Sequence, residues 1–117
     1  MSSGDDDSLS ELNAAACPAV HSMDAIGTPW RLNVLHDLQE GEKRFNELKR
    51  STGASSRTLS QTLDTLTEHG LVAERRAEAA PIAVYYRLTQ KGEALQPVFD
   101  ELEAWAREHM DITDSTA

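Results

Sequence analysis

Apolar residues recur three or four positions apart in the first half of this chain, which is the spacing of one face of an α-helix. The first such segment carries Val20, Met23 and Ile26; Pro18 suits its first turn and Gly27 ends it. The stretch TPWRLNVLHDLQEG (residues 28–41) repeats the pattern, with a capping threonine and a proline at its start and a glycine at its end. It predicts a second helix, whose apolar face is expected to hold Trp30, Val34, Leu35 and Leu38.

Two short helices joined by a glycine turn are predicted next, over residues 45–70. Phe45 and Leu48 direct the first helix inward, and STGA (51–54) forms the turn. Ser55 is a good N-cap for the second helix, and Gly70 fits the left-handed position that closes it. The apolar face of the second helix carries Leu59, Leu63 and Leu66, and its opposite face carries Ser56, Arg57, Ser60, Gln61 and Asp64. This arrangement is a helix-turn-helix signature.

The hydrophobic period changes to two in LVAERRAEAAPIAVYYRLT (71–89), which predicts two short strands around a turn near residues 79–81. On the second strand Val84, Tyr86 and Leu88 alternate with Tyr85 and Arg87. A hairpin directly after the second helix of such a pair is the wing of a winged helix.

The last predicted helix begins after Thr89 as its cap and runs to about Met110, with Pro97 as a potential break. Its apolar side resembles the seam of a coiled coil and consists of Leu95, Val98, Leu102, Trp105 and His109. Four of them, Leu95, Val98, Leu102 and Trp105, are more than one small domain buries easily, which favours a partner subunit over packing within one chain.

The length of 117 residues predicts a single domain. The elements predicted above make this domain mainly α with a small β-hairpin. We expect an acidic flexible arm over residues 1–16, a folded domain over 17–110 and a disordered tail over 111–117. No apolar run reaches the roughly 18 residues of a membrane span, and the acidic N-terminus does not resemble a signal peptide, so a cytoplasmic location is expected. The residues show no cysteine–histidine spacing of a metal site and no nucleotide-binding motif, so no cofactor is predicted.

Charge is distributed unevenly along the chain. The formal net charge is −9, but residues 1–12 carry −4, residues 93–117 carry −6, and residues 43–57 carry +4. The total therefore describes the two ends and hides a basic middle, whose plainest interpretation is a solvated face. Arginines outnumber lysines by eight to three on this acidic background, which suggests a salt-loving archaeon as the source.

In this order and spacing, the motifs from Cys17 to about His109 resemble the HxlR family of winged helix-turn-helix transcription regulators, relatives of MarR. The resemblance is carried by the CP start, Gly27 with Trp30, RFNELKR, S-x-x-x-L-x-x-x-L-x-x-L from Ser55, GLV at 70–72, and Y-x-LT-x-KG from Tyr86 to Gly92. It implies a homodimer with N- and C-terminal dimerisation helices that binds double-stranded operator DNA. The sequence departs from the family at the wing tip, EAAPIA, which lacks the basic residue often found there.

The helix from Ser55 to His69 is the candidate for the major groove, which admits one helix. Arg57 can donate two hydrogen bonds to guanine and Gln61 can pair similarly with adenine; the alternative is that both only keep an exposed helix soluble. Of Arg75 and Arg76, one is expected to reach a phosphate and the other to pair with Glu74 or Glu78. The full predicted DNA-contacting set is Lys43, Arg44, Lys49, Arg50, Ser55, Ser56, Arg57, Ser60, Gln61, Arg75 and Arg76.

The resemblance also assigns the dimer interface to the last helix and the partner's N-terminal helix, through Val20, Met23, Leu95, Val98, Leu102 and Trp105. Cys17 lies at a predicted helix start, which favours a thiolate, and some family members use a cysteine here to sense oxidants. The simpler interpretation, which we favour, is a partly buried residue of the dimer contact.

The leading hypothesis is therefore a sequence-specific, dimeric transcription regulator on a palindromic site. Repression is favoured because a small dimer without an activation domain most simply blocks polymerase. A winged-helix module that binds protein and has lost DNA binding is the alternative. An enzyme, such as a thiol redox protein using Cys17, is disfavoured because the chain has no second cysteine. The sequence does not identify a small-molecule effector.

Overall fold

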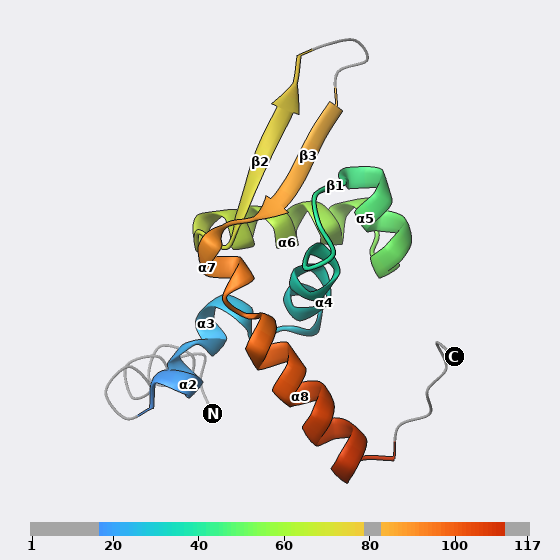
Figure 1. The fold of residues 1–117 in the computed structure, drawn as a ribbon. Helices are drawn as coiled ribbons and strands as arrows, with labels where there is room; N and C mark the ends of the chain where they lie inside the picture. Colours follow the sequence, from blue (N-terminus) through green and yellow to red (C-terminus); the bar gives the residue numbers. More distant parts are fainter. Residues whose placement is uncertain (1–16, 79–82, 112–117) are drawn as a thin grey trace, which may run out of the picture.

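The computed structural model describes residues 17–78 and 83–111. The predicted arm, the turn near residues 79–81 and most of the predicted tail lie outside the described residues. Figure 1 shows the elements, which are α2 (Pro18–His21), α3 (Met23–Ile26), α4 (Pro29–Leu38), β1 (Lys43–Arg44), α5 (Phe45–Thr52), α6 (Ser56–Glu68), β2 (Val72–Ala77), β3 (Ala83–Leu88), α7 (Gln90–Glu93) and α8 (Gln96–His109). The predicted fold class, mainly helical with a small sheet, is confirmed.

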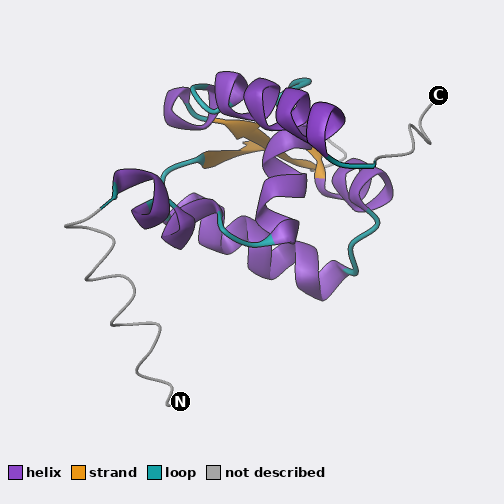
Figure 2. Ribbon diagram, turned by 90° about the horizontal axis from the view of Figure 1, so that it is seen from below, coloured by secondary structure: helices purple, strands orange, loops and turns teal. Residues whose placement is uncertain are grey.

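The sheet has three antiparallel strands in the order β1-β3-β2, one more strand than the sequence predicted. Strands β2 and β3 form the predicted hairpin, with Val72 opposite Leu88 and Ala77 opposite Ala83. The additional strand, β1, is two residues long and pairs Lys43 with Tyr86. Figure 2 shows that the strands occupy one small region among the helices.

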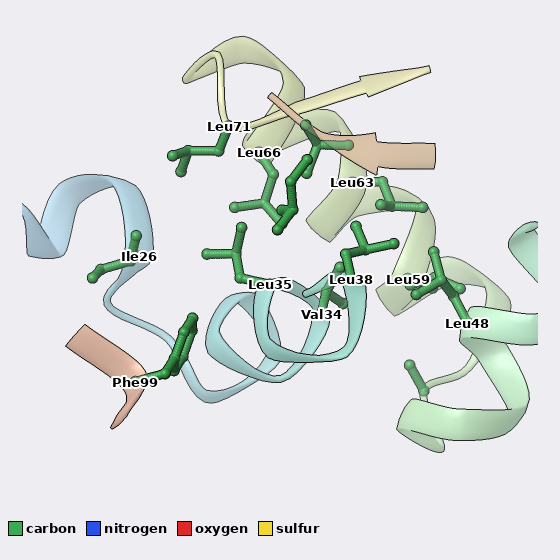
Figure 3. Packing of buried hydrophobic residues seen from close by; sticks show 13 residues of the cluster. Ile26, Val34, Leu35, Leu38, Leu48, Leu59, Leu63, Leu66, Leu71 and Phe99 are labelled. Carbon is green, nitrogen blue, oxygen red and sulfur yellow. The ribbon is translucent and has the colours of Figure 1, made fainter. Parts of the chain in front are cut away.

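The hydrophobic core is centred on α4, which packs against α5, α6 and β3. Val34 and Leu35 of α4 have no exposed surface, and Leu48, Leu59 and Leu66 of the next two helices are equally buried. Figure 3 shows these side chains converging from α4, α5 and α6. The predicted inward faces of the helix-turn-helix are therefore confirmed.

One prediction about the core was wrong, and one core residue was missed. Trp30 remains 39% exposed, because the buried face of α4 consists of Val34, Leu35 and Leu38 and leaves the first turn outside. Phe99, which the sequence did not single out, is 7% exposed and packs into the core beside Ile26 (Figure 3).

The two terminal helical segments are interrupted. The first predicted helix divides at Ser22 into α2 and α3, and only Ile26 of its apolar face is buried. The last predicted helix divides at Ala94 and Leu95, so that Pro97 lies in the first turn of α8, where proline is tolerated, rather than at the break itself. Figure 1 shows α8 leading away from the core on the side opposite the hairpin.

Candidate nucleic-acid interface

Helix α6 separates an apolar face from a polar one as its leucine spacing predicts. The Ser55 Oγ accepts a hydrogen bond from the Thr58 backbone N–H at 3.1 Å, which confirms the predicted N-cap. Its leucine face is at most 2% exposed. All five polar residues predicted on the opposite face are exposed, and they are Ser56, Arg57, Ser60, Gln61 and Asp64. The structure therefore offers this face to solvent or to a ligand.

The C-terminal end of α6 is fixed by residues that follow the hairpin. The Lys91 ammonium donates to the His69 carbonyl at 2.7 Å, and the Thr89 hydroxyl donates to the Gly70 carbonyl at 2.6 Å. These bonds satisfy carbonyl groups that a helix end leaves unpaired. Gly92 is required beside them, because a Cβ there would lie 2.3 Å from the Leu71 carbonyl oxygen. The end of the hairpin thereby holds α6 in place.

Helix α5 presents the basic segment next to α6. The Glu47 carboxylate accepts the Arg44 backbone N–H at 2.8 Å, while Leu48 anchors the helix in the core. Gly53 adopts a φ of +80°, a conformation that glycine accepts readily, and ends the helix. A hollow of about 360 Å³ lies beside this turn and is lined by Asn46, Lys49, Arg50, Gly53 and Ala54. Asn46 was missed by sequence analysis, because a lone asparagine between basic residues gives no signal.

Lys43 has protein partners that its sequence neighbours did not reveal. Its ammonium donates to Asp37 at 2.8 Å and to Glu40 at 2.9 Å, and its side chain is only 17% exposed. Burial alone would lower the pKa of Lys43, but the hydrogen bonds to these two carboxylates outweigh it and the pKa is raised. Ser51 of α5 also donates to the Asp37 carboxylate. The ammonium therefore joins β1 to the end of α4 and to Glu40 rather than standing free.

The neighbouring arginines of the wing lie on opposite faces of the hairpin, because side chains alternate along a strand. Arg75 donates to both carboxylate oxygens of Glu42, at 2.7 and 3.0 Å, and its guanidinium lies 4.5 Å from the centre of the Tyr85 ring. The expected pairing of an arginine with Glu74 or Glu78 is corrected for Arg75: its partner is Glu42, which the sequence places 33 residues away. Arg76 is exposed and lies opposite Val84 in the ladder.

A second face of the molecule is apolar and exposed. On α8, Val98 is 44%, Leu102 49% and Trp105 56% exposed, and together with Pro97 and Glu101 they line an open groove. Leu95, predicted for the same face, instead packs partly against the core. Other large apolar residues left exposed are Val20, Met23, Trp30 and Met110; of these, Trp30 and Met110 were not predicted for an interface.

The remaining candidate residues are scattered. Cys17 is half-buried at the N-cap of α2, and its role as a redox sensor stays a prediction. His36 contacts Glu103 through its Nε2 at 3.0 Å, which joins α4 to α8. Within residues 17–78 and 83–111, no group of three or more side chains is arranged to hold a metal ion. The helices of the same ranges include none that is long and apolar enough to cross a membrane.

Comparison with known proteins gives a consistent result. The model of the HxlR-like helix-turn-helix family matches residues 25–114. The HTH-type transcriptional regulator YodB of Bacillus subtilis is 34% identical over 101 residues, which cover 85% of this chain and 90% of YodB.

Solved structures agree with the sequence comparison. The reduced form of YodB from B. subtilis superposes with a TM-score of 0.74 at 34% identity, covering 84% of this chain and 98% of that one. The redox regulator HypR in its oxidised form gives a TM-score of 0.74 at 30% identity, and the match covers 82% of this chain and the whole of the HypR chain.

Proposed function

Because the chain belongs to the HxlR-like helix-turn-helix family, we propose that it is a transcription regulator that binds double-stranded DNA in a sequence-specific manner. The observation that carries the proposal is the division of α6. Its leucine face is buried against the core, while Arg57 and Gln61 stand exposed on the other face next to the basic surface of α5. A helix presented in this way fits the major groove, where an arginine pairs with guanine and a glutamine with adenine.

Contacts to the DNA backbone are assigned to exposed polar side chains around α6. Lys43 and Arg75 are left out of this set, because carboxylates of the protein already hold their cationic groups. The proposed phosphate-contacting residues are Arg44, Lys49, Arg50, Ser55, Ser56, Ser60 and Arg76. The segment 43–57, which holds most of them, carries a net charge of +4, and this local positive charge would let a protein of net charge −9 attract DNA there.

The regulator is proposed to act as a homodimer. The groove of α8 and the exposed Val20 and Met23 of α2 and α3 are apolar surfaces of the kind that mark protein interfaces. A two-fold dimer would place two α6 helices about one DNA turn apart, which matches a palindromic operator. Repression, by occlusion of polymerase, is the simplest action for such a dimer.

The proposal is tested by fluorescence anisotropy with DNA from upstream of the protein's own gene and with a scrambled duplex, across a range of salt concentrations. Arg57→Ala is expected to lose about tenfold or more of the preference for the true site, since one bidentate base contact contributes about 1–3 kcal/mol of discrimination. Arg107→Ala, which removes an exposed arginine from α8, is the matched control and should leave the preference unchanged.

Equal and feeble binding of both duplexes would prompt a selection of bound fragments from the whole genome. Failure of that selection to enrich any sequence would contradict the proposal. It would favour the alternative, a winged-helix module that binds a protein partner, for which the overall acidity is the supporting observation.

A further inference from the structure

The connection between α4 and β1 makes a bidentate contact with the wing through Glu42. Glu42, in this connection, accepts from the Arg75 Nε at 3.0 Å through Oε2 and from Nη2 at 2.7 Å through Oε1. Two parallel hydrogen bonds fix the angle between the partners as well as their distance. Arg75 lowers the pKa of Glu42, as expected for a carboxylate that stays ionised beside a guanidinium.

Strand β3 adds a further contact to the Glu42–Arg75 pair, which we call the clamp. Tyr85 of β3 lies opposite Arg75 of β2 on one side and opposite Arg44 of β1 on the other. The Arg75 guanidinium lies over the Tyr85 ring at 4.5 Å, where a cation is attracted to the ring face. The guanidinium therefore reaches from one edge strand, across the central strand, to the residue that precedes the other edge strand.

The same connection also holds the helix-turn-helix. Asp37, at the end of α4, accepts from Lys43 and from Ser51 of α5. Glu40 accepts from the Lys43 ammonium at 2.9 Å. Residues 37–43 thus bond to α5 through Asp37 and to the wing through Glu42.

We propose that the Glu42–Arg75 pair is a positioning device that sets the angle of the wing against α5 and α6, and that Glu42 is thereby a determinant of DNA specificity. Arg75 acts through the clamp and not through DNA, while Arg76, on the opposite face of β2, is the residue that the clamped wing presents to the DNA backbone. This inference rests on the proposed function and assigns a role to an acidic residue that a search for DNA contacts would pass over.

Simple electrostatics predicts a different outcome for the loss of Glu42, and the difference makes the proposal testable. Removing a carboxylate near a DNA-binding face leaves the protein more positive and raises its affinity for all DNA. Releasing the wing, in contrast, lowers the affinity for the true site relative to a scrambled one. The ratio of the two affinities separates positioning from charge.

The experiment measures this ratio for Glu42→Gln, Arg75→Lys and the wild type, using DNA fragments selected from the genome by the wild-type protein. Glu78→Gln is the matched control, because it removes the same charge from an exposed position on the same hairpin. We expect Glu42→Gln to lower the ratio by roughly threefold to tenfold, within the range by which non-contacting residues alter coupling between sites. Arg75→Lys keeps the charge but cannot form the bidentate contact, so its ratio should lie between those of the wild type and Glu42→Gln. Glu78→Gln should leave the ratio unchanged.

The exchanged pair Glu42→Arg with Arg75→Glu should recover part of the ratio lost in Glu42→Gln. An equal ratio in Glu42→Gln and the wild type would overturn the proposal. So would a fall of the same size in Glu78→Gln, since it would show that losing a carboxylate from this hairpin lowers the ratio without any change in the Glu42–Arg75 pair.

Hydrogen exchange of the free protein tests the clamp without DNA. Amides of β2 should exchange faster in Glu42→Gln than in the wild type or in Glu78→Gln, while amides of α6 exchange at unchanged rates. Unchanged β2 exchange would overturn the positioning role even if the protein bound no DNA. Faster β2 exchange in a protein without DNA selectivity would instead refute the proposed function and leave the clamp standing.

Discussion

Helices α6 and α8 both carry apolar residues at helical spacing, yet only one of them buries its apolar face. On α6, Leu59 and Leu66 have no exposed surface, whereas Leu102 and Trp105 on α8 are 49% and 56% exposed. The difference lies in the neighbours, because α6 packs against α4, α5 and β2 while α8 reaches the core mainly through Phe99. Helical spacing therefore predicts an apolar face, but it does not predict whether the chain's own core or another molecule covers that face.

The two helices also differ in the charge around them. The segment that contains α5 and the start of α6, residues 43–57, carries +4, while residues 93–117, which contain α8, carry −6. A negative surface is repelled by the DNA backbone, which carries one charge about every 1.7 Å along the duplex. The charge pattern thus favours α6 rather than α8 as the side that meets DNA, and leaves the groove of α8 for a protein partner.

The largest effect that separates the two helices is expected from truncating a leucine on each. Leu66→Ala should lower the free energy of unfolding by about 2–5 kcal/mol, because it leaves a cavity in a packed core. Leu102→Ala should cost less than about 1 kcal/mol in a dilute, monomeric sample, since half of its side chain is already exposed. Urea denaturation measures both, and equal losses would mean that the two leucines share one environment in solution.

A charge placed in the groove of α8 tests what covers it. Trp105→Glu should weaken self-association by at least about 30-fold, the effect of losing one buried aromatic anchor of an interface. Sedimentation equilibrium should then give the monomer mass of 12.9 kDa where the wild type gives twice that value.

Ala104→Glu adds the same charge to an exposed position outside the groove-lining set and serves as the control for Trp105→Glu. A dimer that survives Trp105→Glu, or that Ala104→Glu dissociates equally, would remove the basis for the proposed interface.

The wing arginines, Arg75 and Arg76, are expected to give a smaller effect on the proposed DNA binding. Arg76→Ala should weaken binding to every duplex alike and reduce the slope of log affinity against log salt by about 0.9, the value for one lost phosphate contact. Arg75→Ala should leave that slope nearly unchanged and lower the preference for the true site instead. Titrations at four or more salt concentrations distinguish the two, and identical slopes for both variants would assign them the same role.

Sequence pattern was sufficient for several features that depend on near neighbours in the chain. The N-caps at Thr28, Ser55 and Thr89 and the buried leucines of α6 were predicted because a cap or a helical face involves residues only a few positions apart. The same local logic predicted the paired strands of the hairpin.

Contacts between distant residues could not be predicted in this way. Glu42 and Arg75 are 33 residues apart, and neither has a neighbour that indicates the other. Phe99 was overlooked because it lies beside the exposed seam of α8 and outside its spacing. Lys43 was counted with the DNA-facing cations because a count of charges along the sequence cannot show that Asp37 in α4 and Glu40 just after it lie against its ammonium.

The smallest effect expected is the acid sensitivity of the Glu42–Arg75 pair, which joins the wing to the connection between α4 and β1. The pKa of Glu42 is lowered from its ordinary value of 4.5, chiefly by the hydrogen bond from Arg75. A carboxyl group with a lowered folded-state pKa contributes stability that is present above its ordinary pKa and is lost as pH falls through the folded value. The carboxyl ¹³C signal of Glu42 should therefore titrate with a midpoint below 4.5, and β2 exchange in the wild type should approach that of Glu42→Gln only in this acid range. Arg75→Ala should return the midpoint toward 4.5, and a midpoint that does not respond to Arg75→Ala would show that the clamp does not persist in solution.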